Sequence, residues 1–398
     1  MDIVITPKKL IGSVDVIPSK SQAHRVLICS AFADKATEII CSASNRDIQA
    51  TVSCLNALGA TITETANGYR VLPIQRIPET AILDCAESGS TLRFMLPIVG
   101  ALGVDARFKL SGRLPERPLS PLWELMEHKG CSLVWEDKNI LRCMGKLKAG
   151  NYSIDGSISS QFITGLYFAL PLLCGTSTLE ITGKIESAPY IELTKEALSK
   201  FGVTFDNNEI LGRAHFCSPG QIAIEGDWSN GAFFHAANYI ENDLKIGNLD
   251  HRSKQGDRII VDILKQLQSN TTIDATHIPD LIPILSVAAA CSKGATFTNI
   301  RRLRLKESDR VQAIVKMLSA FGVHATADEN TLTVFPGKFS SCTVDTFNDH
   351  RIAMSAAIAA TVADGQVQIN GAECVAKSYP NFWDEYSRLG GTYEQYLR

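Results

Sequence analysis

The clearest pattern along the chain is an apolar stretch of helical length that follows a short polar cluster, and it occurs six times. A polar cluster ahead of an apolar run is typical of a helix start, because side-chain oxygens accept hydrogen bonds from the first free backbone amides. The predicted helices cover residues 23–32, 92–102, 162–173, 232–240, 281–291 and 352–362. Their starts recur about every 70 residues, except for one step of about 50 before the fifth.

A second helix follows each of these by about 40 residues and ends in a turn that leads into a strand. Glycine just past the last helical residue is a common helix stop. The turns lie at Leu58–Ala60, Lys129–Cys131, Phe201–Val203, Phe321–Val323 and Leu389–Gly391, with Gln268–Asn270 in the fourth place. Short alternating segments such as 61–63 and 331–334 predict strands. We therefore predict an α/β fold of six βαβαββ units, three in each of two similar domains; chance recurrence of common helix caps is the alternative.

Composition narrows the class of protein. A chain of 398 residues is too long for one hydrophobic core, and its net charge of −3 lacks the basic excess typical of nucleic-acid or membrane binders. The eleven cysteines show no C-x-x-C pair and no Cys/His ligand spacing, which predicts reduced thiols, without disulfides or a zinc site. No signal peptide or membrane span is predicted, so we expect a cytoplasmic protein. We also expect a monomer.

Six helix N-termini suggest a binding chemistry. Each presents free backbone N–H groups and the positive end of a helix dipole, which favours phosphate and carboxylate groups. If both halves direct these ends to a shared gap, the gap would trap small anions. Since the whole chain is slightly acidic, the cations must be clustered locally.

Four segments of the first half carry candidate anion ligands. Lys20 and Arg25 lie at the first helix start, residues 87–93 form a small polar turn, Arg113 and Arg117 lie on a proline-containing loop, and residues 156–161 supply hydroxyls and an amide. Each also has a structural reading. The first is a capped helix with solvated charges and the second an ordinary βα turn. The third is a salt bridge to a loop glutamate, and the last is a plain N-cap.

The second half adds candidate acid and base groups. Asp280 precedes an apolar helix, residues 306–310 hold five consecutive polar or charged side chains, and residues 347–351 group three ionisable side chains. Lys377 comes later in the chain. A capping role for Asp280 and a solvated helix face for residues 306–310 are the alternatives.

Taken together and in order, these segments resemble the 3-phosphoshikimate 1-carboxyvinyltransferase (5-enolpyruvylshikimate-3-phosphate synthase) family of enolpyruvyl transferases. The matching stretches are Pro18–Arg25, Ser88–Arg93, Leu114–Pro118, Asp155–Gln161, Ser187–Tyr190, Ile278–Asp280, Leu305–Arg310, Asn348–Ala353 and Ala376–Pro380. The resemblance spans nearly the whole chain.

The resemblance implies a two-domain inside-out α/β barrel in which the chain crosses twice between the domains. Residues 1–18 and 225–398 would form a discontinuous globe on the acid/base and phosphoenolpyruvate side. Residues 19–224 would form the globe on the shikimate-3-phosphate side, with the active site in the cleft between the two.

The implied reaction moves the enolpyruvyl group of phosphoenolpyruvate to the 5-hydroxyl of shikimate 3-phosphate and releases phosphate, without a metal or cofactor. The residues that the resemblance assigns to shikimate 3-phosphate are Lys20, Ser21, Arg25, Ser159, Ser160, Gln161, Ser187, Tyr190, Asp280 and Lys306. Those assigned to phosphoenolpyruvate are Lys20, Gly89, Arg117, Gln161, Arg310, Arg351 and Lys377. Those assigned to proton transfer are Asp280 and Glu307, with Lys20, His350 and Lys377 nearby.

Three positions depart from the family pattern. Glu87 stands where many members have Asn, Ser90 where Thr is common, and Arg302 where some members have Asn. The related UDP-N-acetylglucosamine enolpyruvyl transferases carry a loop cysteine that residues 113–118 lack. A phosphate-sensing protein without catalytic activity is the other alternative, and the presence of Asp280 and Glu307 argues against it.

Overall fold

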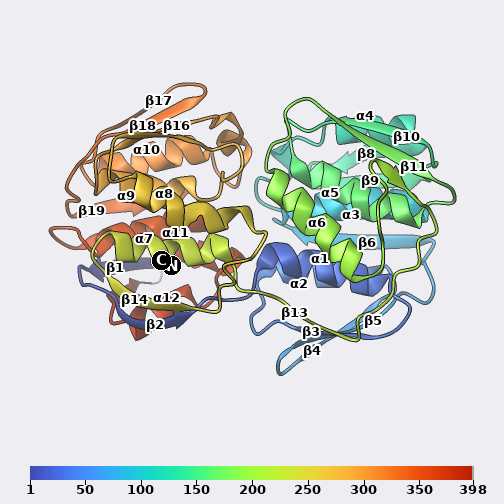
Figure 1. Cartoon of the computed structure of the whole chain (residues 1–398), viewed down its shortest axis with the longest axis horizontal. Helices are drawn as coiled ribbons and strands as arrows, with labels where there is room; N and C mark the ends of the chain where they lie inside the picture. Colours follow the sequence, from blue (N-terminus) through green and yellow to red (C-terminus); the bar gives the residue numbers. More distant parts are fainter. Residues whose placement is uncertain (397–398) are drawn as a thin grey trace. The chain divides into compact units, whose positions relative to one another are not determined.

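The computed structural model describes residues 1–396, which divide into two compact units (Figure 1). Unit 1 combines Met1–Ile17 with the chain from Glu225 onward, and unit 2 is Pro18–Ile224. The corresponding boundaries predicted from the sequence are 1–18 with 225–398, and 19–224. Residues 397–398 of that prediction lie outside the described residues.

Unit 2 is a succession of three folding units. The first consists of α1 (Lys20–Ala31), β3 (Thr37–Ile40), α2 (Arg46–Ala57), β4 (Thr61–Thr65) and β5 (Gly68–Leu72). The second consists of β6 (Thr80–Ala86), α3 (Gly89–Leu102), β7 (Asp105–Leu110), η1 (Leu114–Glu116), α4 (Leu122–His128), β8 (Cys131–Asp137) and β9 (Ile140–Gly145). The third consists of β10 (Asn151–Asp155), α5 (Ser160–Ala169), η2 (Leu170–Leu172), β11 (Ser177–Thr182), α6 (Ala188–Lys200), β12 (Glu209–Ile210) and β13 (Gln221–Ala223).

Unit 1 contains the other three, after the N-terminal strands β1 (Asp2–Thr6) and β2 (Ile11–Asp15). The fourth folding unit consists of α7 (Trp228–Tyr239), β14 (Asp243–Gly247), η3 (Gly256–Ile259) and α8 (Ile260–Gln266). The fifth consists of β15 (Thr271–Asp274), α9 (Ile282–Ala290), β16 (Ala295–Thr298), η4 (Arg301–Leu305), α10 (Arg310–Ala320), β17 (Ala325–Ala327) and β18 (Thr331–Val334). The sixth consists of β19 (Cys342–Asp345), α11 (His350–Ala360), β20 (Val367–Asn370), η5 (Ala372–Lys377), α12 (Phe382–Arg388) and β21 (Thr392–Tyr396).

Four of the sheets share one topology. The described residues form six sheets, three in each unit, and four of these are four-stranded: β13-β3-β5-β4, β6-β7-β9-β8, β15-β16-β18-β17 and β19-β20-β1-β21. In each, the first two strands are parallel and the remaining pairs antiparallel. A parallel pair needs a crossover connection, which in the second, fifth and sixth folding units is α3, α9 and α11, respectively.

Two sheets borrow a strand from a distant part of the chain. Strand β1 pairs antiparallel with both β20 and β21, so the N-terminal residues belong to the last folding unit. Strand β13 pairs parallel with β3 and supplies the first strand of the first folding unit. The pairing of β1 makes unit 1 discontinuous in sequence.

The third and fourth folding units are reduced, and the reduction of the fourth explains the short step in the repeat. Their sheets are β10-β11-β12 and β14-β2, with three and two strands among the described residues. In the fourth, α8 is followed directly by β15 of the next folding unit. In the third, the strand predicted directly after Gly202 is not formed, and of the strands after α6 only the two-residue β12 joins the sheet of this unit.

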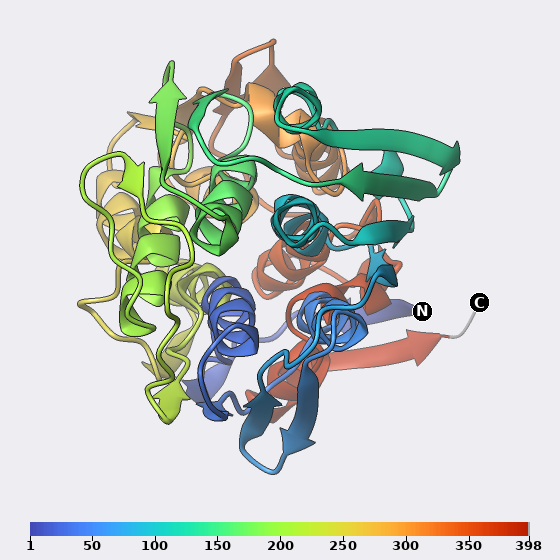
Figure 2. The same ribbon diagram turned by 90° about the vertical axis from the view of Figure 1, so that its right-hand side faces the viewer.

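The six helices that open the folding units form the interior of their units. Every residue of α9 and α11 is buried, and only Ser90 and Leu102 of α3 are not fully buried. The strands instead alternate buried and exposed positions, as in β10. Figure 2 shows this for the part of the chain coloured blue to green, where helices lie inside and strands lie outside. This arrangement is opposite to a barrel with a central sheet, and it accounts for the predominantly apolar sequence of the opening helices.

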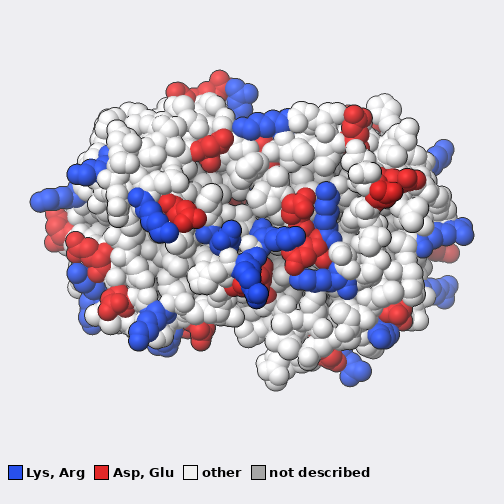
Figure 3. Space-filling view, in the orientation of Figure 1, with Lys and Arg blue, Asp and Glu red and all other residues white. Residues whose placement is uncertain are grey.

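The mixture of basic and acidic side chains on the surface (Figure 3) agrees with the small net charge of −3. Lys and Arg side chains are interspersed with Asp and Glu on the face drawn in Figure 3. Within residues 1–396, no helix is long and apolar enough to cross a bilayer.

Candidate functional site

Two of the residues predicted for proton transfer in unit 1, Asp280 and Glu307, contact one buried guanidinium, that of Arg310. This residue begins α10 and its side chain is 0% exposed. Its Nη1 lies 2.9 Å from Asp280 Oδ1, its Nη2 lies 2.5 Å from Glu307 Oε2, and its Nε lies 2.9 Å from Asp349 Oδ2. A cation at a helix N-terminus is disfavoured by the helix dipole, so these three carboxylates are needed to stabilise it there.

Asp280 is the carboxylate with the most cationic surroundings. It lies between β15 and α9, and its Oδ1 is 3.6 Å from Lys306 Nζ as well as 2.9 Å from Arg310 Nη1. Its Oδ2 is 3.3 Å from Arg351 Nη2. Three cations therefore contact one carboxylate that is largely buried.

These contacts set the ionisation of the cluster. Burial alone would raise the pKa of Asp280, but Arg351, Lys306 and Arg310 together hold that pKa well below its ordinary value. Burial lowers the pKa of Lys306 to about 8, against the opposing attraction of Asp280. Asp280 is therefore an ionised base at neutral pH, and Lys306 is a lysine that can lose its proton near neutral pH.

Helix capping does not account for the two candidate carboxylates. The N-cap position of α9 is Leu281, and within residues 1–396 no side chain caps this helix. The N-cap of α10 is Asp309, whose side chain accepts from Gln312 N, so Glu307 is not the cap either. The side chains of Asp280 and Glu307 contact cations instead.

The remaining predicted residues of unit 1 lie in the sixth folding unit. His350 and Arg351 open α11, whose N-cap Asp349 accepts from Arg351 N and also contacts Arg310. Lys377 ends η5 and is buried, as is His350. Asp349 was not assigned a role from the sequence, although its position before an apolar helix predicted the cap that it forms.

Asp257 is a further buried carboxyl group that the sequence did not single out. It lies in η3, is 2% exposed and accepts a hydrogen bond from Ser229 Oγ. Its other oxygen, Oδ1, has no hydrogen-bond partner among residues 1–396. Burial and the charge of Asp280 raise the pKa of Asp257 to about 7. The only sequence signal was Asp257 itself in a Gln-Gly-Asp segment ahead of a helix, and that is too common to predict burial.

In unit 2, two arginines lie over the start of α3. A Cβ atom on Gly89, the first residue of this helix, would lie 2.7 Å from Nη1 of both Arg117 and Arg93. Glycine therefore leaves room for two guanidinium groups beside the first free amides of a helix. The loop salt bridge to Glu116 is formed by Arg113, at 3.6 Å, whereas Arg117 Nε has no hydrogen-bond partner among residues 1–396.

Arg93 connects this helix start to the one on α5. Its Nη1 donates to Gln161 Oε1 at 2.9 Å, and Gln161 Nε2 donates to Ser90 Oγ at 2.9 Å. Ser159 is the N-cap of α5 and Ser160 its first residue. Three of the predicted ligands, Gly89, Arg117 and Gln161, are thus placed around Arg93, to which the sequence pattern gave no role.

A second group of predicted ligands surrounds Arg25. Its Nη1 donates to Ser21 O at 2.6 Å, and its Nη2 donates to Tyr190 O at 2.8 Å. Ser187, at the start of α6, has a left-handed backbone with φ of 55°. Lys20 lies 3.0 Å from Asp47 Oδ2 at the start of the neighbouring helix α2. The backbone carbonyls and Asp47 hold these cations in place.

Comparison with known proteins identifies the family. The family model described as EPSP synthase (3-phosphoshikimate 1-carboxyvinyltransferase) matches residues 4–386. The chain belongs to the EPSP synthase family. A 3-phosphoshikimate 1-carboxyvinyltransferase of Clostridium beijerinckii is 36% identical, with 99% of each chain covered. One of Clostridium acetobutylicum is 38% identical, with 98% of this chain and 97% of the relative covered.

Solved structures agree on the fold. An EPSP synthase from Acinetobacter baumannii superposes with a TM-score of 0.80 at 22% identity, over 99% of this chain and 100% of the other. The α/β fold, the EPSP synthase family and the transferase class predicted from the sequence are therefore confirmed. The comparisons do not favour UDP-N-acetylglucosamine transfer. The roles assigned to individual side chains remain predictions.

A buried histidine beside Lys20 gives a prediction about stability. His24 Nδ1 lies 2.7 Å from Thr51 Oγ1, and its Nε2 has no hydrogen-bond partner among residues 1–396. Burial lowers the pKa of His24 to about 3. Between that value and the ordinary 6.5, only the unfolded chain binds the proton, so the free energy of unfolding falls as the pH is lowered.

We expect His24→Gln to flatten this dependence by up to about 1.4 kcal/mol per pH unit. Urea unfolding of the wild type and the variant between about pH 7 and pH 4.5 measures it. His128→Gln, at an exposed site, is the control and should follow the wild type. Parallel curves for His24→Gln and the wild type would contradict the prediction.

Proposed function

We propose that the chain transfers the enolpyruvyl group of phosphoenolpyruvate to the 5-hydroxyl of shikimate 3-phosphate and releases phosphate. The observation that carries the proposal is the pair Asp280 and Glu307 held on one buried arginine, in a chain that belongs to the EPSP synthase family. Paired acid and base groups beside a dense set of cations are what an addition–elimination reaction between two anionic substrates requires.

In the proposed reaction, the 5-hydroxyl oxygen of shikimate 3-phosphate bonds to C2 of phosphoenolpyruvate, and the ionised Asp280 accepts the proton of that hydroxyl group. Glu307 delivers a proton to the methylene carbon, which becomes a methyl group. The Glu307 carboxylate then takes a proton back from that methyl group as the C–O bond to phosphate breaks, and the proton held by Asp280 passes to the departing phosphate. Lys306, with a pKa of about 8, supports the proposal because it can also exchange a proton near neutral pH.

We propose that the substrate anions are held by the cations at helix starts. The guanidinium groups of Arg117 and Arg93 over Gly89 suit the phosphate or carboxylate of phosphoenolpyruvate, because an arginine fork matches two anionic oxygens. The group around Arg25, with Lys20, Ser159 and Ser160, suits shikimate 3-phosphate. These ligands lie in unit 2, and the proposed acid/base groups lie in unit 1.

The eleven cysteines support a location in the cytoplasm, which we propose for this protein. Within residues 1–396 none of them forms a disulfide, and free thiols are typical of proteins in reducing compartments such as the cytoplasm.

The test is a phosphate-release assay with the purified chain. We expect release only when phosphoenolpyruvate and shikimate 3-phosphate are both present, with an enolpyruvyl ether detected by mass spectrometry. Replacing shikimate 3-phosphate by UDP-N-acetylglucosamine should give no release. Binding of both substrates without phosphate release would instead indicate a sensor and overturn the proposal.

The assignment of phosphoenolpyruvate ligands gives its own prediction. Arg117→Ala and Lys377→Ala should each weaken phosphoenolpyruvate far more than shikimate 3-phosphate. A charge-assisted contact contributes about 1.5–3 kcal/mol, so we expect a loss of about 10- to 150-fold in affinity for phosphoenolpyruvate. Arg113→Ala is the matched control, because Arg113 is exposed and paired with Glu116. Equal weakening of both substrates would show that the assignment is wrong.

A further inference from the structure

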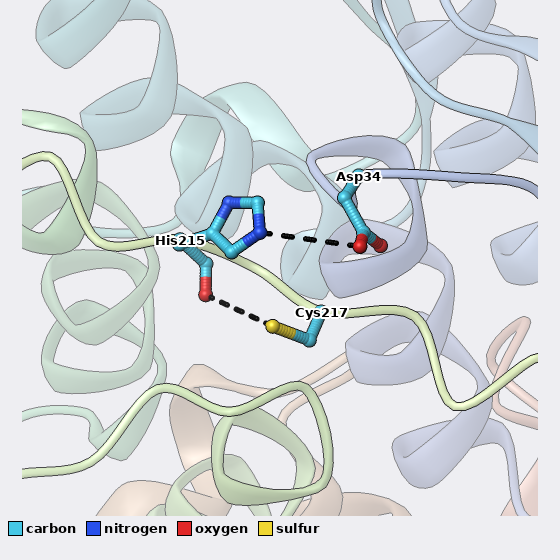
Figure 4. A group of neighbouring side chains, drawn as sticks. All are labelled: Asp34, His215 and Cys217. Atoms are coloured by element: carbon cyan, nitrogen blue, oxygen red, sulfur yellow. Dashed lines mark hydrogen bonds and ion pairs between the residues drawn. The ribbon is translucent and has the colours of Figure 1, made fainter.

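A cluster of three potential metal ligands lies in unit 2, away from the residues assigned to the transfer reaction. Asp34 lies three residues after the end of α1, and His215 and Cys217 lie shortly before β13. A carboxylate oxygen, an imidazole nitrogen and the thiol sulfur of these residues all lie within 4.8 Å of one another. Figure 4 shows the His215 ring facing the Asp34 carboxylate, with the Cys217 side chain below them.

The backbone explains why the three side chains converge. Residues 33 and 216 form a parallel bridge, and Asp34 N donates to Phe216 O at 2.9 Å. Side chains alternate along an extended segment, so His215 and Cys217 point to the side opposite Phe216. The Phe216 ring is buried and packs on Phe32 at 6.1 Å between centroids. The inward Phe216 thus fixes both flanking side chains outward.

The carboxylate of Asp34 is also held in place. Its Oδ1 accepts from Ser218 N at 2.8 Å, which leaves Oδ2 directed toward His215 Nε2 at 3.9 Å. Cys217 Sγ lies 3.8 Å from His215 O. In a tetrahedral zinc site, bond lengths of about 2.0–2.3 Å place the ligand atoms roughly 3.3–3.6 Å apart. Exposed side chains can close the remaining distance by rotating about their side-chain bonds.

We propose that Asp34, His215 and Cys217 bind a zinc-type divalent cation with water in the fourth position. One thiolate, one imidazole and one carboxylate are the donors that zinc prefers, whereas Mg²⁺ and Ca²⁺ prefer oxygen alone. Binding releases the thiol proton, and the two anionic ligands then balance the charge of the ion. The bound ion links the end of α1 to the last segment of unit 2.

The sequence could not predict this site, because Asp34 is far in the chain from the two other ligands. Spacing rules find ligands that lie a few residues apart, and only the strand-like bridge between residues 33 and 216 brings this carboxylate to the histidine. The proposal does not depend on the transferase activity, because none of the three residues belongs to the predicted substrate site.

The experiment uses Co²⁺ as a spectroscopic probe on the full chain after treatment with EDTA. We expect one equivalent of Co²⁺ to give a thiolate charge-transfer band that added Zn²⁺ displaces. Cys217→Ser should remove the band, and Asp34→Asn and His215→Ala should each weaken Zn²⁺ by at least about 10-fold in a chelator competition. Zn²⁺ should also raise the Tm of the wild type but not that of Cys217→Ser.

Matched controls are available among the other exposed cysteines. Cys174→Ser and Cys291→Ser each remove an exposed thiol elsewhere in the chain and should keep the band and the Zn²⁺ affinity. A band that survives Cys217→Ser, or one that is lost in either control, would overturn the proposal. Equal Zn²⁺ affinity in the wild type and His215→Ala would do the same.

Discussion

We expect at least one of Asp280→Asn and Glu307→Gln to lower turnover by about 10²–10⁴-fold, the contribution typical of a general acid or base. Both substitutions keep the size of the side chain and remove its ability to carry the proton. Asp280 is the expected base at the 5-hydroxyl, because three cations keep it ionised. Glu307 is the expected proton donor at the methylene carbon.

A purely structural role predicts a different result. If the two carboxylates only capped helices, an amide would preserve much of that function and turnover would change little. Neither is an N-cap, since Leu281 and Asp309 occupy the N-cap positions of α9 and α10. Asp309→Asn is therefore the matched control, two residues from Glu307, and it should keep turnover.

The measurement is turnover together with affinity for shikimate 3-phosphate and the free energy of unfolding for all three variants. Lower turnover with retained folding and affinity supports proton transfer. Near-normal turnover in both Asp280→Asn and Glu307→Gln would refute it, leaving Lys20 and Lys377 as candidates for the proton steps.

Local signals were sufficient to predict the repeat. Each opening helix has a polar N-terminus, and five of the six have a side-chain cap among residues 1–396, such as Ser88 and Asp227. These signals depend on residues only three or four positions apart, so they can be recognised in the sequence without knowledge of the fold. The short step before the fifth opening helix was also visible, but its cause was not. The missing antiparallel strands of the fourth folding unit become evident only when β14 and β2 are seen to pair alone.

Non-local pairing and side-chain geometry could not be read from patterns. The pairing of β1 with β20 and β21 joins opposite ends of the chain, and the discontinuous domain was predicted only through the family resemblance. Asp257 and Arg93 were missed as site residues for the same reason. Their importance arises from burial and from partners such as Ser229 and Gln161, which are distant in sequence.

The guanidinium of Arg310 is surrounded by carboxylates, which its sequence assignment did not include. The resemblance assigns it to phosphoenolpyruvate, and its guanidinium contacts Asp280, Glu307 and Asp349. These carboxylates raise its pKa despite a burial that alone would lower it, so it stays charged. A substrate anion would therefore meet an arginine whose charge is already balanced. We propose that Arg310 also positions Asp280 and Glu307, the two predicted proton-transfer groups.

That role predicts a large loss of stability. We expect Arg310→Met to lower the free energy of unfolding by about 3–5 kcal/mol, the cost of removing one partner from a buried ion pair. Arg304→Met is the control, because Arg304 pairs with Asp309 at 3.2 Å on the surface and such pairs contribute at most about 1 kcal/mol. Urea unfolding of both variants measures the difference, and Arg310→Lys, which keeps the charge but fewer contacts, should lie between Arg310→Met and the wild type.

The pH dependence separates lost charge pairing from lost packing. In the wild type the pKa of Asp280 is depressed, so the stability it contributes is present at neutral pH and is lost progressively as the pH falls from the ordinary pKa of aspartate toward the depressed value. Without Arg310, the carboxylates that shared it become easier to protonate, and protonation relieves their repulsion. The deficit of Arg310→Met should therefore be smaller at about pH 4 than at about pH 7. A deficit that is the same at both values would mean that packing rather than charge pairing is lost, and a deficit no larger than that of Arg304→Met would remove the positioning role.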